Sequence, residues 1–399
     1  MSKKIIIIII IILVLAAGGI WFYLRQTGKI PGEPISISNL FPSSGENNIN
    51  LPSGNNNSTG GNGLPTGGGT SQNIFLQLTT DSVSGAAWSS TTVKYIEQAT
   101  GNIYEILPDG QNKKRITNTT ILKTFDASWS KDANKLILKY FDNTDSAYPS
   151  IKNFMATIKN STTTELGSLS GIFLPNGSKE ALISPFEDKI FYFTGSNNIT
   201  NGVIAGLDNK KQANIFSSSF GEFLVDWPVK NTITLLTKPS AMAEGFFYTL
   251  DAKTGKLTKI LGNLYGLTAL LSPDGQKVFY SYFNNGSLAS KIFDVKNKTD
   301  QSLDITTLAD KCVWSLLNKN IIYCAVPQNF PSANYPDDWY MGIVFFNDNI
   351  WQKDLSTGET KVLVENTNTD AINLFLSASE NYLFFTNKKD NTLWSVKLK

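Results

Sequence analysis

The sequence predicts an all-β fold, a seven-bladed β-propeller that is preceded by one N-terminal transmembrane helix and a disordered linker. Three observations support this prediction. A short segment with an apolar residue before Ser or Pro recurs seven times after residue 73, at spacings of 41 to 62 residues. No segment from residue 73 onward shows a helical period of apolar residues. The chain begins with an apolar stretch, and a region of small polar residues follows it.

The apolar stretch covers residues 5–24, which include no charged residue. A helix rises about 1.5 Å per residue, so this stretch can span the hydrocarbon core of a bilayer. Lys3 and Lys4 precede it, and a short basic N-terminus before a long domain favours an N-terminus inside the cell. We expect residues 1–29 to be a retained signal anchor in the bacterial cytoplasmic membrane. Cleavage near residues 16–19, as in a signal peptide, is the alternative.

Residues 30–72 have the composition of a flexible linker. Of these 43 residues, 32 are Gly, Asn, Ser, Pro or Thr, and only Glu33 and Glu46 are charged. Segments of this composition behave as random coils. The sequence therefore predicts three parts: the anchor at 1–29, the linker at 30–72 and the propeller at 73–399.

Seven similar units follow one another in the predicted propeller. Four of the eight tryptophans occupy the same position in these units, immediately before Ser or Pro. The apolar residues at this position are Trp88, Trp129, Ile183, Trp227, Leu271, Trp314 and Leu376. A period of about 40–50 residues is typical of propeller blades with four strands each.

Each unit also contains the other strands of a blade. A β-rich run is expected to form the second strand, as at 135–140, 189–193, 277–282, 320–325 and 381–386. Polar hairpins at 251–255 and 354–358 end in glycine, which supplies the positive φ of a short turn. The last unit lacks an outer strand. Residues 74–79 have the alternation of apolar and polar side chains that is typical of an outer strand. They can provide that strand and so close the ring.

Residues 272–275 read Ser-Pro-Asp-Gly, and other units carry degenerate copies of this motif. The motif resembles the TolB-type, WD40-like β-propeller repeat of bacterial envelope proteins, and the resemblance covers nearly all of 73–399. The segment 335–340 (YPDDWY) also resembles a feature of membrane-anchored propeller proteins from small-genome bacteria. The resemblance implies a fold and does not imply an activity.

The composition excludes several classes of site. Histidine is absent and arginine occurs only at Arg25 and Arg115, which excludes a Ser-His-Asp triad, a His-ligated metal and an arginine cluster for phosphate. Lys and Arg number 35 against 33 Asp and Glu, and nothing beyond the N-terminus favours polyanions. We therefore expect no nucleic acid partner, no metal and no cofactor.

Candidate binding residues lie in the connections between second and third strands, which share one face of a propeller. These connections are expected at 141–150, 194–202, 238–245 and 326–348. The longest one combines aromatic surface with carboxylate acceptors. The five residues that we expect to bind a ligand are Tyr335, Asp337, Asp338, Trp339 and Tyr340. The alternative is an insertion whose aromatic residues only pack onto the rim or cover the channel.

Other carboxylates are expected on the same face, and a suitable pair of them could cleave a glycan. They are Asp142, Asp145, Glu244 and Asp348. No pair is specified by the sequence, because some carboxylates are expected in any set of loops. No catalytic residue is therefore assigned.

Cys312 and Cys324 lie on the first and second strands of the sixth unit. Neighbouring antiparallel strands can be bridged when the two side chains share a face. In an exported domain we expect these two residues to form a disulfide. Two buried free thiols are the alternative.

The sequence thus favours a binding or scaffold protein over an enzyme. We expect a membrane-tethered, extracytoplasmic propeller that binds an envelope protein, peptide or glycan through the face with the long connections. A carboxylate-dependent glycan-cleaving enzyme and an architectural, self-assembling surface protein are the alternatives.

Overall fold

The computed structural model describes residues 74–399 except 143–149, 160–165, 197 and 285. The predicted anchor and linker lie outside the described residues, and the described residues belong to one compact unit. Among the residues described, no helix has the length and apolar character needed to cross a bilayer.

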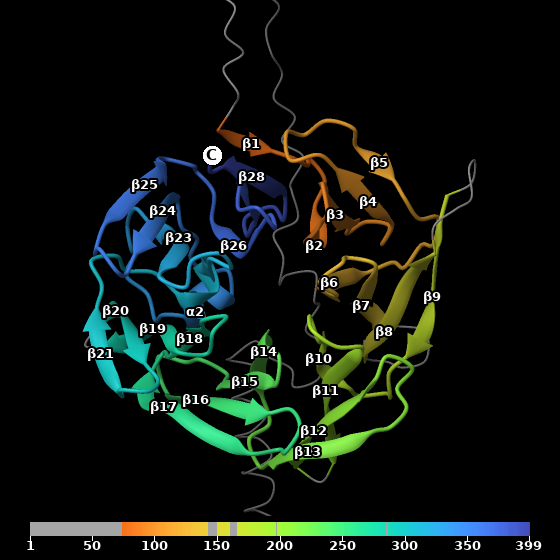
Figure 1. The fold of residues 1–399 in the computed structure, drawn as a ribbon, viewed down its shortest axis with the longest axis horizontal. Coiled ribbons are helices and arrows are strands. Elements are labelled where there is room, and N and C mark those ends of the chain that lie inside the picture. The colour runs from red at the N-terminus through yellow and green to blue at the C-terminus, as the bar shows by residue number, and fades with distance from the viewer. Residues whose placement is uncertain (1–73, 143–149, 160–165, 197, 285) are drawn as a thin grey trace, which may run out of the picture. The chain divides into compact units, whose positions relative to one another are not determined.

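The described strands form seven antiparallel sheets of four strands each, arranged as the blades of a ring (Figure 1). Blade 1 contains β2 (Val83–Ser89), β3 (Thr92–Glu97), β4 (Ile103–Ile106) and β5 (Lys114–Arg115), and blade 2 contains β6 (Thr124–Trp129), β7 (Lys135–Asp142), β8 (Ser150–Lys159) and β9 (Ser168–Phe173). Blade 3 contains β10 (Lys179–Ile183), β11 (Lys189–Ser196), β12 (Ile199–Gly206) and β13 (Ala213–Ser218), and blade 4 contains β14 (Phe223–Val229), β15 (Thr232–Thr237), β16 (Glu244–Asp251) and β17 (Leu257–Tyr265).

The remaining three blades complete the ring. Blade 5 contains β18 (Thr268–Leu271), β19 (Lys277–Asn284), β20 (Ser287–Asp294) and β21 (Thr299–Ser302), and blade 6 contains β22 (Cys312–Trp314), β23 (Ile321–Pro327), β24 (Asp348–Asp354) and β25 (Thr360–Val364). Blade 7 contains β26 (Ala371–Leu376), β27 (Tyr382–Asn387), β28 (Leu393–Lys397) and β1 (Phe75–Gln77). Helical structure is limited, within these residues, to η2 (Ala309–Lys311) and α2 (Asp337–Tyr340).

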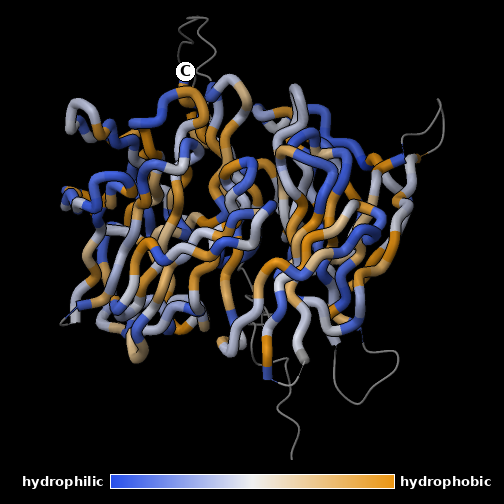
Figure 2. Tube along the Cα trace, turned by 60° about the horizontal axis from the view of Figure 1, so that its bottom comes forward, coloured by the Kyte–Doolittle hydropathy of each residue, from blue (hydrophilic) through white to orange (hydrophobic). Residues whose placement is uncertain are grey.

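The second strand of a blade is deeply buried, because neighbouring blades cover both of its faces. In β3, β7, β19 and β27 at least four consecutive residues are buried. These strands are rich in β-branched and aromatic residues, which suit a covered, pleated surface. Figure 2 shows apolar residues along the strands and hydrophilic residues in many of the connections. The five second strands predicted from the sequence are confirmed.

The connections of a blade alternate between the two faces of the ring, because neighbouring strands are antiparallel. The connection between the second and third strands lies on the face at which the first strand begins, and we call this the long-loop face. The predicted loop at 194–202 is wrong. There the backbone pairing of β11 with β12 continues as far as Ser196 and Ile199, so the segment is a hairpin of two long strands.

The N-terminal strand closes the ring as predicted. β1 pairs with β28 in antiparallel register, with Phe75 opposite Val396 and Gln77 opposite Trp394. The Phe75 ring stacks on that of Trp394, with 4.7 Å between the centroids. The last blade therefore has a complete outer strand, and the edge of β28 is covered.

Candidate functional site

The insertion in blade 6 connects β23 to β24 on the long-loop face and contains α2, which lies toward the inside of the ring (Figure 1). Its own small core consists of Tyr335, Trp339 and Phe346 packed on Leu308. The Tyr335 and Trp339 side chains are only 3% and 2% exposed. The structure thus brings the predicted aromatic residues together, but it buries two of their rings, which present no free face for stacking.

Of the other three predicted residues, Asp337 and Tyr340 bond the insertion to its surroundings, and Asp338 makes a hydrogen bond within the insertion. The Asp337 carboxylate accepts a hydrogen bond from the backbone N–H of Ala241 in blade 4, at 2.6 Å. The Asp338 carboxylate accepts one from the N–H of Asn334 at 2.8 Å. The Tyr340 hydroxyl donates to Asp310 at 2.9 Å. Burial raises the pKa of Tyr340, and its carboxylate partner raises it further. These contacts support packing of the insertion onto the ring, the alternative that the sequence left open.

A buried ionic cluster of Lys311, Asp348 and Asp370 lies beneath the insertion, and all three side chains are 0% exposed. The Lys311 ammonium lies 2.9 Å from Asp348 and is also paired with Asp370. It donates another hydrogen bond to the carbonyl of Ala371 at 3.0 Å. Removing a charge from water is costly unless opposite charges and hydrogen bonds replace the lost hydration. The two carboxylates and the carbonyl provide that replacement here.

Asp370 connects this cluster to the insertion. Its second carboxylate oxygen accepts hydrogen bonds from the Trp339 indole N–H at 2.9 Å and from the Phe346 backbone N–H at 3.0 Å. The Lys311 ammonium also lies 5.3 Å from the centroid of the Trp339 ring. One oxygen of the Asp370 carboxylate therefore binds the insertion, and its other oxygen binds the buried ammonium of Lys311.

The four carboxylates considered for glycan cleavage differ from one another in their partners and positions. Asp348 belongs to the buried ionic cluster, and burial raises its pKa. Glu244 accepts a hydrogen bond from the Asn263 amide at 2.9 Å. Asp142 ends β7, and Asp145 lies outside the described residues. Asp142, Glu244 and Asp348 belong to blades 2, 4 and 6, so these three described residues do not form one constellation.

An exposed apolar surface follows α2 and was not predicted. Met341, Ile343 and Phe345 are 60%, 66% and 36% exposed. Met242, which is 80% exposed, follows Ala241, whose backbone N–H is bonded to Asp337 at the start of α2. We call these four residues the apolar tip. The sequence analysis chose the tyrosines and the tryptophan of the insertion. In the structure two of these rings are buried, whereas Met341, Ile343 and Phe345 are exposed.

A second feature missed by the sequence analysis is a pocket of about 590 Å³ on the long-loop face, formed by blades 2, 3 and 4. We call it the blade 2–4 pocket. It is lined by Phe125, Asp126, Lys139, Ile151, Asn153, Lys179, Glu180, Phe193, Gly221, Glu222, Phe223, Leu224 and Lys238. A sequence signal was present, because Asp126 and Glu180 occur three residues before the repeated apolar positions Trp129 and Ile183.

The Lys139 ammonium organises the charges of this pocket. It lies 2.8 Å from Asp126 and 3.6 Å from Glu180, and its side chain is 11% exposed. Burial disfavours the charged lysine, but the two carboxylates outweigh this effect and raise its pKa. The pocket therefore contains a fixed ammonium and two carboxylates. Within the part of the chain that the structure describes, no group of three or more His, Cys, Asp and Glu residues could hold a metal ion.

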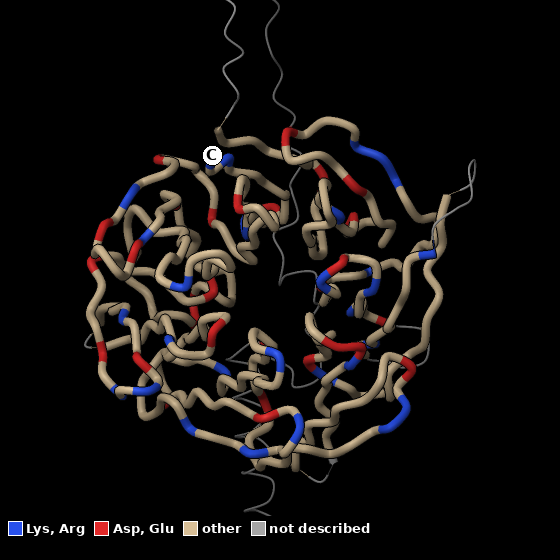
Figure 3. The backbone as a smooth tube through the Cα atoms, viewed as in Figure 1, with Lys and Arg blue, Asp and Glu red and all other residues tan. Residues whose placement is uncertain are grey.

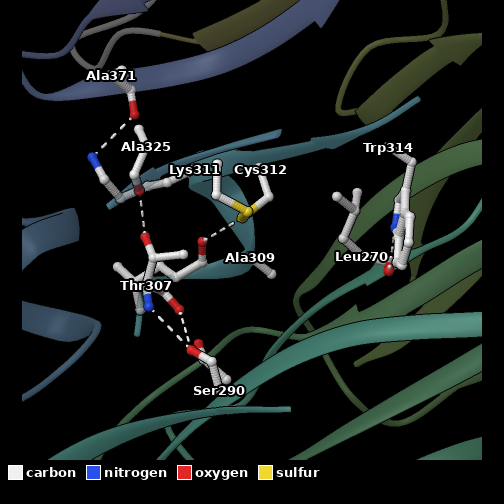
Figure 4. Close-up of a disulfide and its surroundings, with 12 residues drawn as sticks. Leu270, Ser290, Thr307, Ala309, Lys311, Cys312, Trp314, Ala325 and Ala371 are labelled. Carbon is white, nitrogen blue, oxygen red and sulfur yellow. Dashed lines mark hydrogen bonds between the residues drawn. A yellow bond between two sulfur atoms is a disulfide. The ribbon is translucent and has the colours of Figure 1, made fainter. Parts of the chain in front are cut away.

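Cys312 and Cys324 form a disulfide in the structure (Figure 4). They face each other in the pairing of β22 with β23, and their Cα atoms are 4.1 Å apart. Both residues are buried beside Ile322 and Trp314. Figure 4 also shows Lys311, the neighbour of Cys312, reaching the Ala371 carbonyl of blade 7. The disulfide thus fixes the start of β22, next to the end of η2 from which the buried lysine projects.

Comparisons with known proteins show the fold. An oligogalacturonate lyase in complex with manganese superposes with a TM-score of 0.55 at 10% identity, over 82% of this chain and 93% of that chain. An oligogalacturonate lyase from Vibrio parahaemolyticus gives 0.51 at 8% identity, over 82% and 93%. TolB from Acinetobacter baumannii gives 0.41 at 12% identity, over 76% of this chain and 61% of that chain.

No family model and no curated protein matches the chain. The solved structures are similar to it only at the level of architecture, and one fold serves many activities. The seven-bladed propeller expected from the TolB-type repeat is confirmed by the arrangement of the sheets.

Proposed function

We propose that this chain is a membrane-tethered, extracytoplasmic binding module that docks an envelope protein through the insertion of blade 6. The observation that carries the proposal is the apolar tip, which exposes Met341, Ile343 and Phe345 on an insertion that is anchored at several points, together with Met242 of blade 4. Exposed apolar groups that adjoin one another are typical of protein interaction sites.

Rigidity of the insertion favours binding. Interface residues lose conformational entropy on association, and a surface that is already ordered loses less. The bonds from Trp339 and Phe346 to Asp370, and from Ala241 to Asp337, fix both sides of the apolar tip before any partner arrives. The carboxylates of Asp337 and Asp338 accept hydrogen bonds from backbone N–H groups. Their role in the site is therefore to support it.

Membrane tethering is the second part of the proposal. It rests on residues 5–24, which have the length and apolar character of a membrane-spanning helix, and on the basic residues before them. The linker at 30–72 would let the propeller reach a partner at a distance from the membrane. The Cys312–Cys324 disulfide supports an oxidising compartment, because disulfides persist in exported proteins.

One experiment tests docking and topology together. The Ile343→Cys variant of the full chain carries one free thiol, since the two native cysteines are bonded to each other. In spheroplasts of the native host, a membrane-impermeant maleimide that bears a photoreactive group should label this thiol. Illumination should then produce one discrete cross-linked species.

The matched control is Leu317→Cys. Leu317 is 64% exposed and lies between β22 and β23, on the face opposite to the insertion. We expect this variant to be labelled but to give no discrete adduct. Failure to label either variant would contradict the external location of the propeller. Equal cross-linking by both variants, or by neither, would contradict docking through the apolar tip.

A further inference from the structure

The blade 2–4 pocket shares no residue with the apolar tip, and its occupant can be considered independently of the docking proposal. Its volume of about 590 Å³ is in the usual range for small-ligand sites, which runs from about 300 to 1,000 Å³. Three blades contribute to it, so its walls are held by strands of three different sheets.

Two carboxylates and one ammonium lie on the floor of the pocket, whereas over the whole lining Asp126, Glu180 and Glu222 are matched in number by Lys139, Lys179 and Lys238. Asp126 and Lys139 are cross-strand neighbours in blade 2, and Glu180 reaches the same ammonium from blade 3. Two carboxylates thus share one lysine. The Asp126 and Glu180 side chains are 48% and 41% exposed, whereas that of Lys139 is 11% exposed. The carboxylates are therefore accessible to a ligand, and the lysine that partly neutralises them is largely covered.

Asn153 provides an independent indication of a ligand with donor groups. It lines the pocket opposite Lys139 in the β7–β8 pairing and is only 2% exposed. Its amide N–H group donates to Ser178, but its Oδ1 has no hydrogen-bond partner among the described residues. Buried acceptors are nearly always paired in folded proteins. The pocket thus contains a buried acceptor without a donor beside the two exposed carboxylates.

The walls of the pocket are apolar. Phe193 and Phe223 are buried behind its surface, while Ile151 and Leu224 are 44% and 36% exposed. At the rim, the carboxylate of Glu222 is already paired with Lys238 at 2.7 Å. A ligand that fits these surroundings combines an apolar group for the walls with a cationic donor for the floor.

We propose that the blade 2–4 pocket binds a primary ammonium group next to an apolar side chain, as at the N-terminus of a peptide that begins with an apolar residue. The ammonium lies between Asp126 and Glu180, and the apolar side chain contacts Ile151 and Leu224. A neutral sugar would bring no positive charge to the Asp126 and Glu180 carboxylates. A carboxylate or phosphate placed between them would be repelled by both.

Binding of short peptides to the purified full chain, in detergent, tests this proposal by calorimetry. The probe is leucyl-alanine amide, which has a free amino group and no carboxylate. We expect it to bind at least about tenfold more tightly than its N-acetylated form, because acetylation removes a charge-assisted hydrogen bond. Glycyl-alanine amide should also bind more weakly, since it lacks the apolar side chain. Absence of binding, or equal binding of the acetylated peptide, would overturn the proposal.

Substitutions at Glu180 separate binding from folding. Glu180 has a φ of 44°, which is unfavourable for glutamate, and the residue at the same repeat position in blade 7 is Asn373 with a φ of 53°. Asparagine tolerates this conformation better, so Glu180→Asn should fold normally. Glu180→Gln preserves the size of the side chain. We expect both variants to lose at least about tenfold in affinity for leucyl-alanine amide without a large fall in Tm.

Glu222→Gln is the matched control. It removes a carboxylate from the rim that is already paired with Lys238, so affinity should change by less than about threefold. If both Glu180 variants kept the wild-type affinity for leucyl-alanine amide, the placement of the ammonium between Asp126 and Glu180 would be refuted. An equal loss in the Glu222 variant would show a general charge effect and would also refute it.

Discussion

At the scale of single residues, Lys311 connects blade 6 with blade 7 beneath the long-loop face. It lies three residues before Trp314, the position at which blades 2 and 3 carry Asp126 and Glu180. In blade 6 this position is fully buried, and the lysine is paired with Asp348 and Asp370. A buried ion pair is weak evidence for net stabilisation, but loss of one partner leaves an uncompensated charge. The two carboxylates differ in what else they bind.

We predict that Asp370→Asn destabilises the protein much more than Asp348→Asn. Asp370 accepts bonds from Lys311, the Trp339 indole and the Phe346 N–H, so its loss should cost about 3–5 kcal/mol. Asp348 has one oxygen without a partner, and an amide can keep its bond from Ala371, so its loss should cost about 1–2 kcal/mol. Urea unfolding at neutral pH measures both values. Equal losses would show that Asp370 does not anchor the insertion.

At the scale of elements, the closing strand joins the two ends of the folded domain. Beyond the β1–β28 register, the Leu78 N–H donates to the Leu393 carbonyl at 2.7 Å and the Lys397 N–H donates to the Ile74 carbonyl at 2.7 Å. Phe75 also packs on Phe385 of β27. β1 thus contributes both ladder bonds and apolar burial to blade 7.

Deletion of residues 73–80 should therefore lower the free energy of unfolding by several kcal/mol, because the β28 edge and the rings beneath Phe75 become exposed. Deletion of residues 35–65, which lie in the linker, should leave it unchanged. Thermal unfolding of the two deletion variants and of the full chain measures the difference in stability. Similar effects of the two deletions would indicate that the ring is stabilised by other contacts.

The elements of the blades could be predicted because their signals are local. The second strands, the closing strand and the hairpin glycines Gly255 and Gly358, with φ of 69° and 77°, follow from short patterns. The long strands β11 and β12 could not, because Gly195 and polar neighbours favour a loop while backbone pairing extends the hairpin. The same limit applies to Trp339, whose burial depends on Asp370, 31 residues away in sequence.

At the scale of the whole molecule, charges of both signs are interspersed around the ring (Figure 3). Many acidic and basic groups are paired with each other or with backbone groups, whereas several tyrosines are buried within and above the blades. Burial is the main cause that raises the pKa of Tyr95, Tyr323 and Tyr335 to about 12 in each case. Tyr95 belongs to blade 1, and Tyr323 and Tyr335 belong to blade 6 and its insertion, so alkaline pH acts on two separate blades of the ring.

We predict that stability falls as the pH rises from about 10 to about 12. An unfolded tyrosine loses its proton near pH 10, while the three buried tyrosines keep theirs until about pH 12. The folded state therefore binds more protons in this interval, and by linkage the free energy of unfolding decreases with pH. The raised pKa of Lys139 acts in the same direction. Urea midpoints measured across this interval test the sign, and a rising midpoint would contradict it.

Tyr95→Phe assigns part of this effect to one residue. The Tyr95 hydroxyl is buried, with the Lys113 ammonium as its polar neighbour, so its removal should lower stability near neutral pH by no more than about 1 kcal/mol. Phenylalanine cannot ionise, and the variant should lose less stability between about pH 10 and 12 than the original chain does. Tyr265→Phe is the control, because Tyr265 is 47% exposed and its removal should leave the alkaline slope as it is. A slope that Tyr95→Phe does not reduce would place the alkaline sensitivity elsewhere in the ring.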